Sequence, residues 1–519
     1  MLKDNVQKTE ILASIDSDHS PIVIKFGELG PDIRGPSIWK YPSTLSQDLV
    51  YVNQVKKLIT DVQNELAEPS HQLRWEYVKF KIREFSINYS KKKAKQKRQQ
   101  IDRLETIITA YENTPTDTQQ DTYESARIEY DELLTEKTNG HILRAKTKDF
   151  QSAEKCSKYF LNLEKKRAIN NTLKRLCIDS ENPTEITHTQ TITNEIKKFY
   201  SNLYSTRTDE TSETCSRFLD EIDFPTLSIQ ENNFLNQTIT IDNLKKAIKN
   251  SKNGKSPGSD GLTREFYIVF WIDVSELVFN SLNEAKSVGE LSDTQRQAVI
   301  KLLDKRKYKR FIKNLRPISL INYDTKMLSK TLADRLREVL PSLISCDQTA
   351  YIKDRFLGES VRLISDVLEV SKSYNLDGYL LTIDIEKAFD SVEHNFLFAS
   401  LEEYGFHGYF LDWIKILLKN QQSCVLNGGN STGFFPLQRG SRQGDPISAY
   451  LFILVIEVIF NAAKSDANIK PLEMFDTKFL LTSYADDTTF FLKDPNSAKI
   501  IFGIFEKISR FSGLKVNSS

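Results

Sequence analysis

Three aspartates stand at the ends of apolar segments and could hold metal ions. Asp384 follows the apolar run from Tyr379 to Ile383, and Asp486 and Asp487 lie in a short polar turn between two further apolar runs. The β-branched and aromatic residues around that turn predict a β-hairpin with two adjacent carboxylates at its tip. Asp-Asp in a turn is also ordinary turn chemistry. A second acidic strand end upstream favours a site in which carboxylates from different strands bridge two Mg²⁺ ions about 4 Å apart.

The elements that must position these carboxylates follow from the neighbouring sequence. Residues after Asp384 turn into a helix, with Ser391 as the expected cap of a helix from Val392 onward. Between the acidic segments lies a basic loop, residues 439–448, that contains Gly440 and Gly444 and leads into an apolar helix. Glycines allow another backbone or a ligand to approach closely, and the start of the helix could offer N–H groups to a phosphate.

In this order the three segments resemble motifs A, B and C of reverse transcriptases. Their sequences are DIEKAFDSV at 384–392, RQGDPIS at 442–448 and YADD at 484–487. They most resemble the motifs of LINE-type non-LTR retrotransposons. Four further elements resemble the same family: SPGSDG at 256–261, LRPISL at 315–320, DQTAYI at 347–352 and FSGLKVN at 511–517. The resemblance therefore extends from the SPGSDG element to the end of the chain.

The resemblance implies an α+β right-hand polymerase with fingers and an antiparallel palm sheet, preceded by a long helical linker. We expect an endonuclease remnant in residues 1–26, a mostly helical linker with a basic nucleic-acid-binding region in 27–190, fingers in 191–375 and palm in 376–519. The thumb of the family and the lysine of its motif D would follow Ser519. The chain therefore reads as an internal fragment, and full activity would depend on sequence beyond it.

The resemblance also implies a reaction, the template-directed addition of dNTPs to a primer 3′-OH that copies RNA into DNA. Asp384 and Asp486 match the ligands of two Mg²⁺ ions, for which Mn²⁺ could substitute, with the Ile385 carbonyl as a further ligand and Asp487 as a supporting carboxylate. The expected partners are an RNA template, a DNA primer or target, and element RNA in a ribonucleoprotein, with no membrane.

Four residues match the part of the family that holds the incoming nucleotide. Phe389, five residues after Asp384, matches a steric gate that rejects a 2′-OH, although a plain core phenylalanine is the alternative. Gln443 and Gly444 match the loop that cradles the nucleotide, and Arg316 matches a residue that holds the triphosphate, which suits a bidentate guanidinium.

The N-terminus carries a second resemblance. Residues 17–24, SDHSPIVI, resemble the last strand motif of the endonuclease/exonuclease/phosphatase family, in which the residue matching His19 is the general base and the one matching Asp18 orients it. One such pair without a metal site cannot run metal-assisted hydrolysis, so we interpret it as a remnant. Its presence favours a LINE-type element over a group II intron maturase or another cellular reverse transcriptase.

Composition fits a large intracellular enzyme. The chain has 519 residues, 39% hydrophobic content and a net charge of +1, which argues against a uniformly basic nucleic-acid binder. Its five cysteines are scattered without a CxxC pair, which suggests neither a disulfide framework nor a zinc site. The sequence shows no targeting signal, and we expect a cytoplasmic ribonucleoprotein and the nucleus as its locations.

The densest basic cluster lies in a predicted long helix. It comprises Lys91, Lys92, Lys93, Lys95, Lys97 and Arg98. Clustered cations release counterions from a polyanion, so we expect contact with an RNA or DNA backbone, although a solvated helix face is the alternative. The leading hypothesis is therefore a LINE-type reverse transcriptase, and the competing one is a truncated, non-catalytic RNA-binding relic of such an element.

Overall fold

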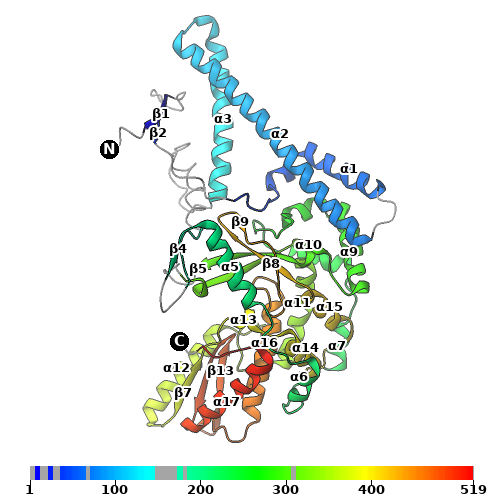
Figure 1. Cartoon of the computed structure of the whole chain (residues 1–519), viewed down its shortest axis with the longest axis vertical. Coiled ribbons are helices and arrows are strands. Elements are labelled where there is room, and N and C mark those ends of the chain that lie inside the picture. The colour runs from blue at the N-terminus through cyan, green and yellow to red at the C-terminus, as the bar shows by residue number, and fades with distance from the viewer. Residues whose placement is uncertain are drawn as a thin grey trace.

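The computed structural model describes residues 6–11, 22–26, 35–65, 70–145, 172–178, 184–304 and 311–517. Helices and strands mix throughout, as expected for an α+β protein. A helical hairpin rises from one end of a body in which two β-sheets lie one below the other (Figure 1). Asp18 and His19 lie outside the described residues, so the endonuclease remnant stays a prediction.

The hairpin, here called the arm, is formed by α2 (His71–Asn113) and α3 (Gln120–Ala145), with α1 (Leu49–Glu65) beside its base. Buried Leu104, Ile108, Ala126 and Tyr130 hold α2 and α3 together. The apolar stripe of α2 breaks at Lys91–Arg98, yet the helix continues without a break. The stripe breaks because the helix leaves the body there, so that its side chains meet solvent rather than the core.

Buried polar contacts fix the base of the arm to the body. The indole nitrogen of Trp75 donates to Asp324 Oδ2 at 2.8 Å, and Lys79 Nζ pairs with the same oxygen at 3.1 Å. All three side chains are buried. Separating the arm from the body would leave Lys79 and Asp324 as buried charges without partners, which is costly. These contacts therefore hold the arm firmly to the body.

The upper sheet of the body has the order β10-β8-β5-β6, with β9 beside β8. Its strands are β5 (Gln297–Asp304), β6 (Leu315–Ile321), β8 (Gln422–Asn427), β9 (Asn430–Ser431) and β10 (Phe435–Pro436). Helix α5 (Thr189–Leu203) packs on this sheet through Ile192, Ile196 and Tyr200. Strand β6 contains the LRPISL element and pairs antiparallel with β5.

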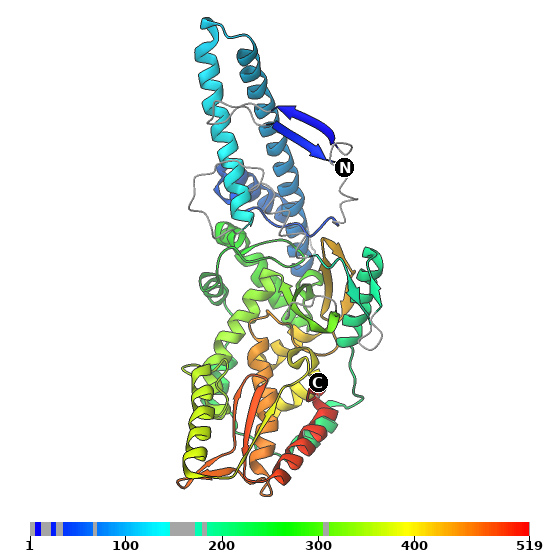
Figure 2. The same cartoon turned by 90° about the vertical axis from the view of Figure 1, so that its left-hand side faces the viewer.

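The lower sheet is antiparallel, in the order β13-β14-β7. It comprises β7 (Tyr379–Ile383), β13 (Leu481–Tyr484) and β14 (Asp487–Leu492). Helix α12 (Leu357–Tyr374) contacts β13, and α17 (Pro495–Ser512) contacts β14 and α16 (Ser448–Ser465) (Figure 2). The expected strand before Asp384 and the expected hairpin around Asp486 are both present.

The other helices and strands complete the described part of the chain. They are β1 (Val6–Ile11), β2 (Ile22–Phe26), β3 (Leu176–Cys177), β4 (Glu185–Ile186), α6 (Ser212–Leu219), α7 (Ile229–Leu235), α8 (Ile241–Lys249), α9 (Arg264–Val288), α10 (Asp293–Arg296), α11 (Tyr323–Leu343), α13 (Ala388–Ser391), α14 (His394–Glu403), α15 (Gly408–Leu418), β11 (Leu472–Met474) and β12 (Thr477–Phe479).

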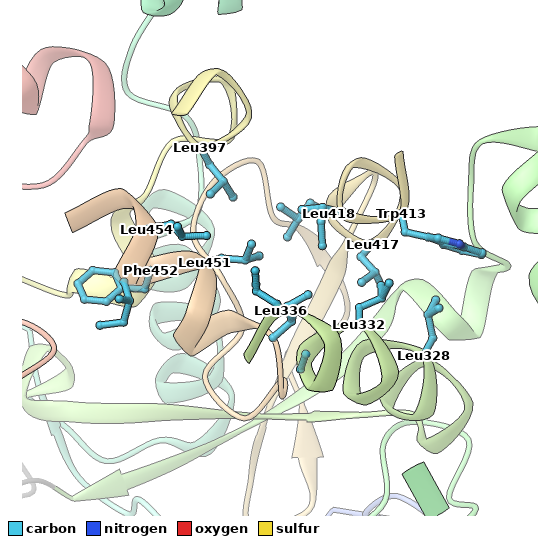
Figure 3. Packing of buried hydrophobic residues seen from close by; sticks show 14 of the residues in the cluster. Leu328, Leu332, Leu336, Leu397, Trp413, Leu417, Leu418, Leu451, Phe452 and Leu454 are labelled. Carbon is cyan, nitrogen blue, oxygen red and sulfur yellow. The ribbon is translucent and has the colours of Figure 1, made fainter. Parts of the chain in front are cut away.

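The main core lies where α11, α14, α15 and α16 meet. Figure 3 shows Leu332 and Leu336 of α11, Leu417 of α15 and Leu451 of α16 converging on one another. By length and composition α16 could cross a membrane, but 67% of its apolar window is buried inside the protein. Burial of that extent is typical of the central helix of a core.

The expected cap at Ser391 is wrong. Ser391 is the last residue of the short helix α13, and its hydroxyl donates to the carbonyl of Glu386 at 3.3 Å. The backbone is extended at Val392, and α14 begins at His394. The acidic segment therefore forms a separate turn of helix before α14, which places Asp390 in the interior of the body.

Candidate active site

The sheet register brings the three predicted carboxylates to one end of the lower sheet. Tyr484 pairs with Asp487 across the β13–β14 turn, and Thr488 pairs with Ile383 of β7. Asp487 and Asp384 are the next residues along these two strands, so both follow the sheet to the same end. Asp384 and Asp487 are exposed and Asp486 is half-buried. The carboxylates are thus open to a ligand from solvent.

The turn that carries Asp486 has an unusual backbone. Ala485 has φ of +60°, whereas Asp486 does not have a positive φ. A two-residue hairpin loop with a positive φ only at its first central residue is of type II′, which normally has glycine at that position. An alanine in this conformation costs of order 1–3 kcal/mol, and the conformation persists only where the surrounding structure enforces it.

Asp384 is tied to the C-terminal segment of the chain. The Asn517 backbone N–H donates to the Asp384 carbonyl at 2.8 Å, and Asn517 Nδ2 donates to Asp384 Oδ2, also at 2.8 Å. An isolated antiparallel bridge joins Ile385 to Val516. The FSGLKVN element therefore lies against the start of the DIEKAFDSV element and orients its first carboxylate.

The glycine loop approaches two other backbones closely, as the sequence predicted. A Cβ on Gly440 would lie 2.6 Å from the Asp390 carbonyl oxygen, and one on Gly444 would lie 2.7 Å from the Ser319 carbonyl oxygen. The Ser319 N–H in turn donates to the Gln443 carbonyl at 2.7 Å. The loop thus joins the DIEKAFDSV segment to the LRPISL strand, and a side chain at either glycine would separate them.

A buried relay holds the side chain of Gln443. Gln443 Nε2 donates to Asp390 Oδ2 at 3.0 Å, and the Tyr204 hydroxyl donates to Asp390 Oδ1 at 2.7 Å. Burial, together with the nearby Asp390 carboxylate, raises the pKa of Tyr204 well above its usual value, so that its hydroxyl stays protonated. A carboxylate only accepts, so Gln443 turns its NH₂ inward and its carbonyl oxygen away from Asp390.

The two arginines of the basic loop and several N–H groups at the start of α16 have partners inside the protein. Arg439 and Arg442 of the basic loop are buried: Arg439 pairs with Glu393 at 3.5 Å, and Arg442 donates to the Gln422 carbonyl at 3.0 Å. Two N–H groups at the start of α16 also have partners: the N–H of the cap residue Ile447 donates to Ser329 Oγ at 3.3 Å, and that of Ser448 donates to the Asp445 carbonyl at 3.2 Å. These arginine side chains and backbone N–H groups therefore stabilise the conformation of the loop through contacts inside the protein.

Phe389 and Arg316 lie at the edges of the site. The Phe389 ring is half-buried and stacks on Phe452, with 4.6 Å between ring centroids. Arg316 is exposed on β6. Burial raises the pKa of Tyr351, the Tyr484 hydroxyl and the Asp486 carboxylate raise it further, and the Arg316 guanidinium opposes the shift. Tyr351 is therefore within electrostatic reach of both Arg316 and Asp486.

The carboxylate oxygens at this end of the lower sheet are donors that fit Mg²⁺. In the described ranges, no three His, Cys, Asp or Glu side chains form a preformed metal cluster. Mg²⁺ is usually held by one or two carboxylates together with substrate phosphates and water, rather than by an all-protein cage. Asp384, Asp486 and Asp487 provide carboxylates of this kind at an exposed edge.

The basic cluster on α2 divides into two faces, because successive helix residues are rotated by about 100°. Lys93 and Lys97 point toward neighbouring elements, where they pair with Asp48 and Glu136. The other four cations are exposed and pair with no carboxylate in the part of the chain that the structure describes; this cationic face comprises Lys91, Lys92, Lys95 and Arg98. It remains a predicted nucleic-acid contact.

Carboxylates at one end of an antiparallel sheet, next to a glycine loop, define a polymerase-like α+β protein. Residues 303–519 match the family described as reverse transcriptase (RNA-dependent DNA polymerase). This part of the chain is therefore similar to reverse transcriptases, and the relatives that follow are described as transposon or retrotransposable-element proteins.

The protein described as "Transposon TX1 uncharacterized 149 kDa protein" of Xenopus laevis is 28% identical over 501 residues, which cover 95% of this chain and 38% of that protein. The Pol polyprotein from the type-2 retrotransposable element R2DM of Drosophila melanogaster is 25% identical over 269 residues, 51% of this chain and 24% of that protein. A Pol polyprotein from the type-1 element R2 of Popillia japonica is 28% identical over 179 residues, 34% of this chain and 24% of that protein. The chain thus spans well under half of each relative.

Sequence reasoning missed the residues that support the site. Tyr204 belongs to no recognised motif, and Gln348 and Asn517 lie in motifs to which no role was assigned. Their contacts join segments far apart in the chain, so no local pattern could reveal them. The only available signal was polarity: Gln348 and Asp390 sit in segments that are otherwise buried.

Proposed function

We propose that this chain is the polymerase part of an RNA-directed DNA polymerase of a non-LTR retrotransposon. It would add deoxynucleotides to a primer 3′-OH while copying an RNA template. The observation that carries the proposal is the convergence of Asp384 with Asp486 and Asp487 at one end of the β13-β14-β7 sheet. The matches to the reverse transcriptase family and to the retrotransposon proteins support it.

The role that we propose for each residue of the site follows from its position. Asp384 and Asp486 would hold two Mg²⁺ ions, with the Ile385 carbonyl and Asp487 in support. Bound Mg²⁺ lowers the pKa of a primer hydroxyl and neutralises charge on the triphosphate. The exposed Arg316 would bind triphosphate oxygens, and Gln443, held inward by Asp390, would present its carbonyl oxygen to the nucleotide. Phosphoryl transfer depends mainly on such positioning and charge neutralisation.

The expected parts of a polymerase can be assigned to elements of the fold. Residues 376–519, with the lower sheet, α16 and α17, would form the palm, and residues 191–375, with β5, β6 and the helices around them, would form the fingers. Phe389 would lie below the sugar and select dNTPs over rNTPs. The cationic face of α2 would contact nucleic acid backbone at a distance from the chemistry.

The test is Mg²⁺-dependent primer extension on an RNA template, with the unmutated chain compared to Asp486→Asn. We expect Asp486→Asn to abolish extension and to leave RNA binding nearly intact, because only a metal ligand changes. Asp476→Asn is the matched control, since Asp476 occupies the exposed turn of the neighbouring β11–β12 hairpin. Extension that survives in Asp486→Asn, or that is lost equally in Asp476→Asn, would refute the metal assignment.

A further inference from the structure

A buried side chain fills the space behind the turn that carries Asp486. Gln348 is fully buried, and it lies in a segment that runs beside β13. The Ser483 N–H donates to the Asp347 carbonyl at 2.8 Å, and the Thr349 N–H donates to the Ser483 carbonyl at 2.9 Å. These backbone bonds set the Gln348 side chain directly against the turn.

All four hydrogen-bonding positions of the Gln348 amide are in use. Its Oε1 accepts from the Ala485 N–H at 2.9 Å and from the Ala350 N–H at 2.9 Å. Its Nε2 donates to the Ala485 carbonyl at 3.2 Å and to Ser483 Oγ at 3.2 Å. A glutamine amide has two donors and two main acceptor positions, so this one is saturated. Turning the amide over would set its NH₂ against two N–H groups, so its orientation is fixed.

The amide therefore binds both backbone polar groups of Ala485, the residue of this turn whose backbone has a positive φ. Ala485 has φ of +60°; its N–H donates to Gln348 Oε1, and its C=O accepts from Gln348 Nε2 and from Ser483 Oγ, each at 3.2 Å. Gln348 satisfies both and so stabilises the strained turn over the relaxed alternatives. Asp486 is the next residue, and its direction depends on the conformation of Ala485.

We propose that Gln348 is a positioning residue for catalysis, which holds the Ala485–Asp486 turn in the conformation that presents Asp486 to the metal ions. The role rests on the proposed polymerase function. Gln348 touches neither substrate nor metal and acts only through Ala485. A misplacement of about 1 Å at a reacting group can cost roughly 10²-fold in rate, which is the scale of effect we expect.

The experiment combines Gln348→Ala with Ala485→Gly. Gln348→Ala should lower kcat in primer extension by roughly 10²-fold, with the KM for dNTP and the affinity for RNA little changed. Ala485→Gly in the same chain should restore about tenfold, because glycine adopts a positive φ without strain and no longer needs the grip. Gln348→Glu, which keeps the side-chain volume and removes both donors, should also lose kcat and serves if Gln348→Ala folds poorly.

Gln421→Ala is the matched control. Gln421 is a buried glutamine whose Nε2 donates to the Leu417 carbonyl at 2.6 Å, outside the catalytic turn. It should lower stability and leave the kcat of the folded protein unchanged. An unchanged kcat in Gln348→Ala, or no recovery on adding Ala485→Gly, would overturn the proposal.

Hydrogen exchange separates this proposal from the polymerase assignment. The Ala485 amide should be protected in the unmutated chain and should exchange at least about tenfold faster in Gln348→Ala, even if the chain extends no primer. Protection that persists in Gln348→Ala overturns the grip whatever the activity. Loss of protection together with an inactive unmutated chain supports the grip and refutes only the proposed function.

Discussion

Tyr204→Phe tests the buried relay through which Asp390 holds Gln443. The substitution removes one hydroxyl and keeps the ring, which stacks on Phe435 with 6.4 Å between centroids. Tyr204 is 1% exposed and Asp390 0% exposed, so water cannot replace the missing donor. A hydrogen bond to a charged group contributes about 1.5–3 kcal/mol, and we expect the free energy of unfolding to fall by that amount.

Tyr200→Phe provides a control of matched size. Tyr200 lies on the preceding turn of α5, is equally buried and stacks on Tyr204 at 6.2 Å. Among the described residues its hydroxyl has no hydrogen-bond partner. Removing a buried, unsatisfied hydroxyl should be neutral or stabilising.

The assay is urea-induced unfolding of the unmutated chain and both variants, followed by primer extension at varied dNTP concentration. Tyr204→Phe should be less stable than Tyr200→Phe, and its KM for dNTP should rise because Asp390 no longer holds Gln443 firmly. Equal unfolding free energies for the two variants, within about 0.5 kcal/mol, would refute the relay.

Three other outcomes follow from the same structure. Replacing the four residues of the cationic face by glutamine should weaken RNA binding and reduce its salt dependence by up to about one log unit of slope for each phosphate that the helix no longer neutralises, whereas Lys93→Gln and Lys97→Gln should do less; equal effects would contradict the two-face division. Phe389→Ala should admit ribonucleotides in primer extension, and unchanged sugar discrimination would remove the gate role. Burial, opposed by Lys79, raises the pKa of Asp260 to about 7. The folded state then binds this proton more tightly than the unfolded chain does, so the contribution to stability is present below about pH 4 and is lost as pH rises through about 7. Asp260→Asn should flatten this pH dependence in urea unfolding, and an unaltered profile would exclude Asp260 as its source.

Patterns of short range predicted the parts of the site that touch solvent. The β-branched and aromatic residues around a short polar turn predicted the β13–β14 hairpin, and an apolar run predicted β7 before Asp384. The close backbone approach at Gly440 and Gly444 followed from residue type alone. Each of these features is decided within about ten residues, which is the range over which periodicity and turn preferences act.

Tertiary contacts decided the features that the sequence did not predict. Ser391 has the residue type of a helix cap, but the backbone after it is extended and bonded to distant segments: the Val392 carbonyl accepts from the Gly440 N–H, and the Glu393 N–H donates to the Ser512 carbonyl. Arg439 and Arg442 have the residue type of phosphate ligands, yet they are buried. In both cases local preference was overridden by a partner far away in the sequence.

The supporting residues bear on the choice between an enzyme and a relic. The three aspartates are exposed or half-buried, so their loss would cost little stability, whereas Gln348, Tyr204 and Asp390 are buried and hydrogen-bonded. A chain that only binds RNA has no need of a buried amide that binds both backbone groups of a strained residue, because an alanine at a negative φ would be less costly there. The strained Ala485 and the glutamine that holds it lie directly before Asp486, and under the proposed positioning role this arrangement favours a catalytic site over a relic.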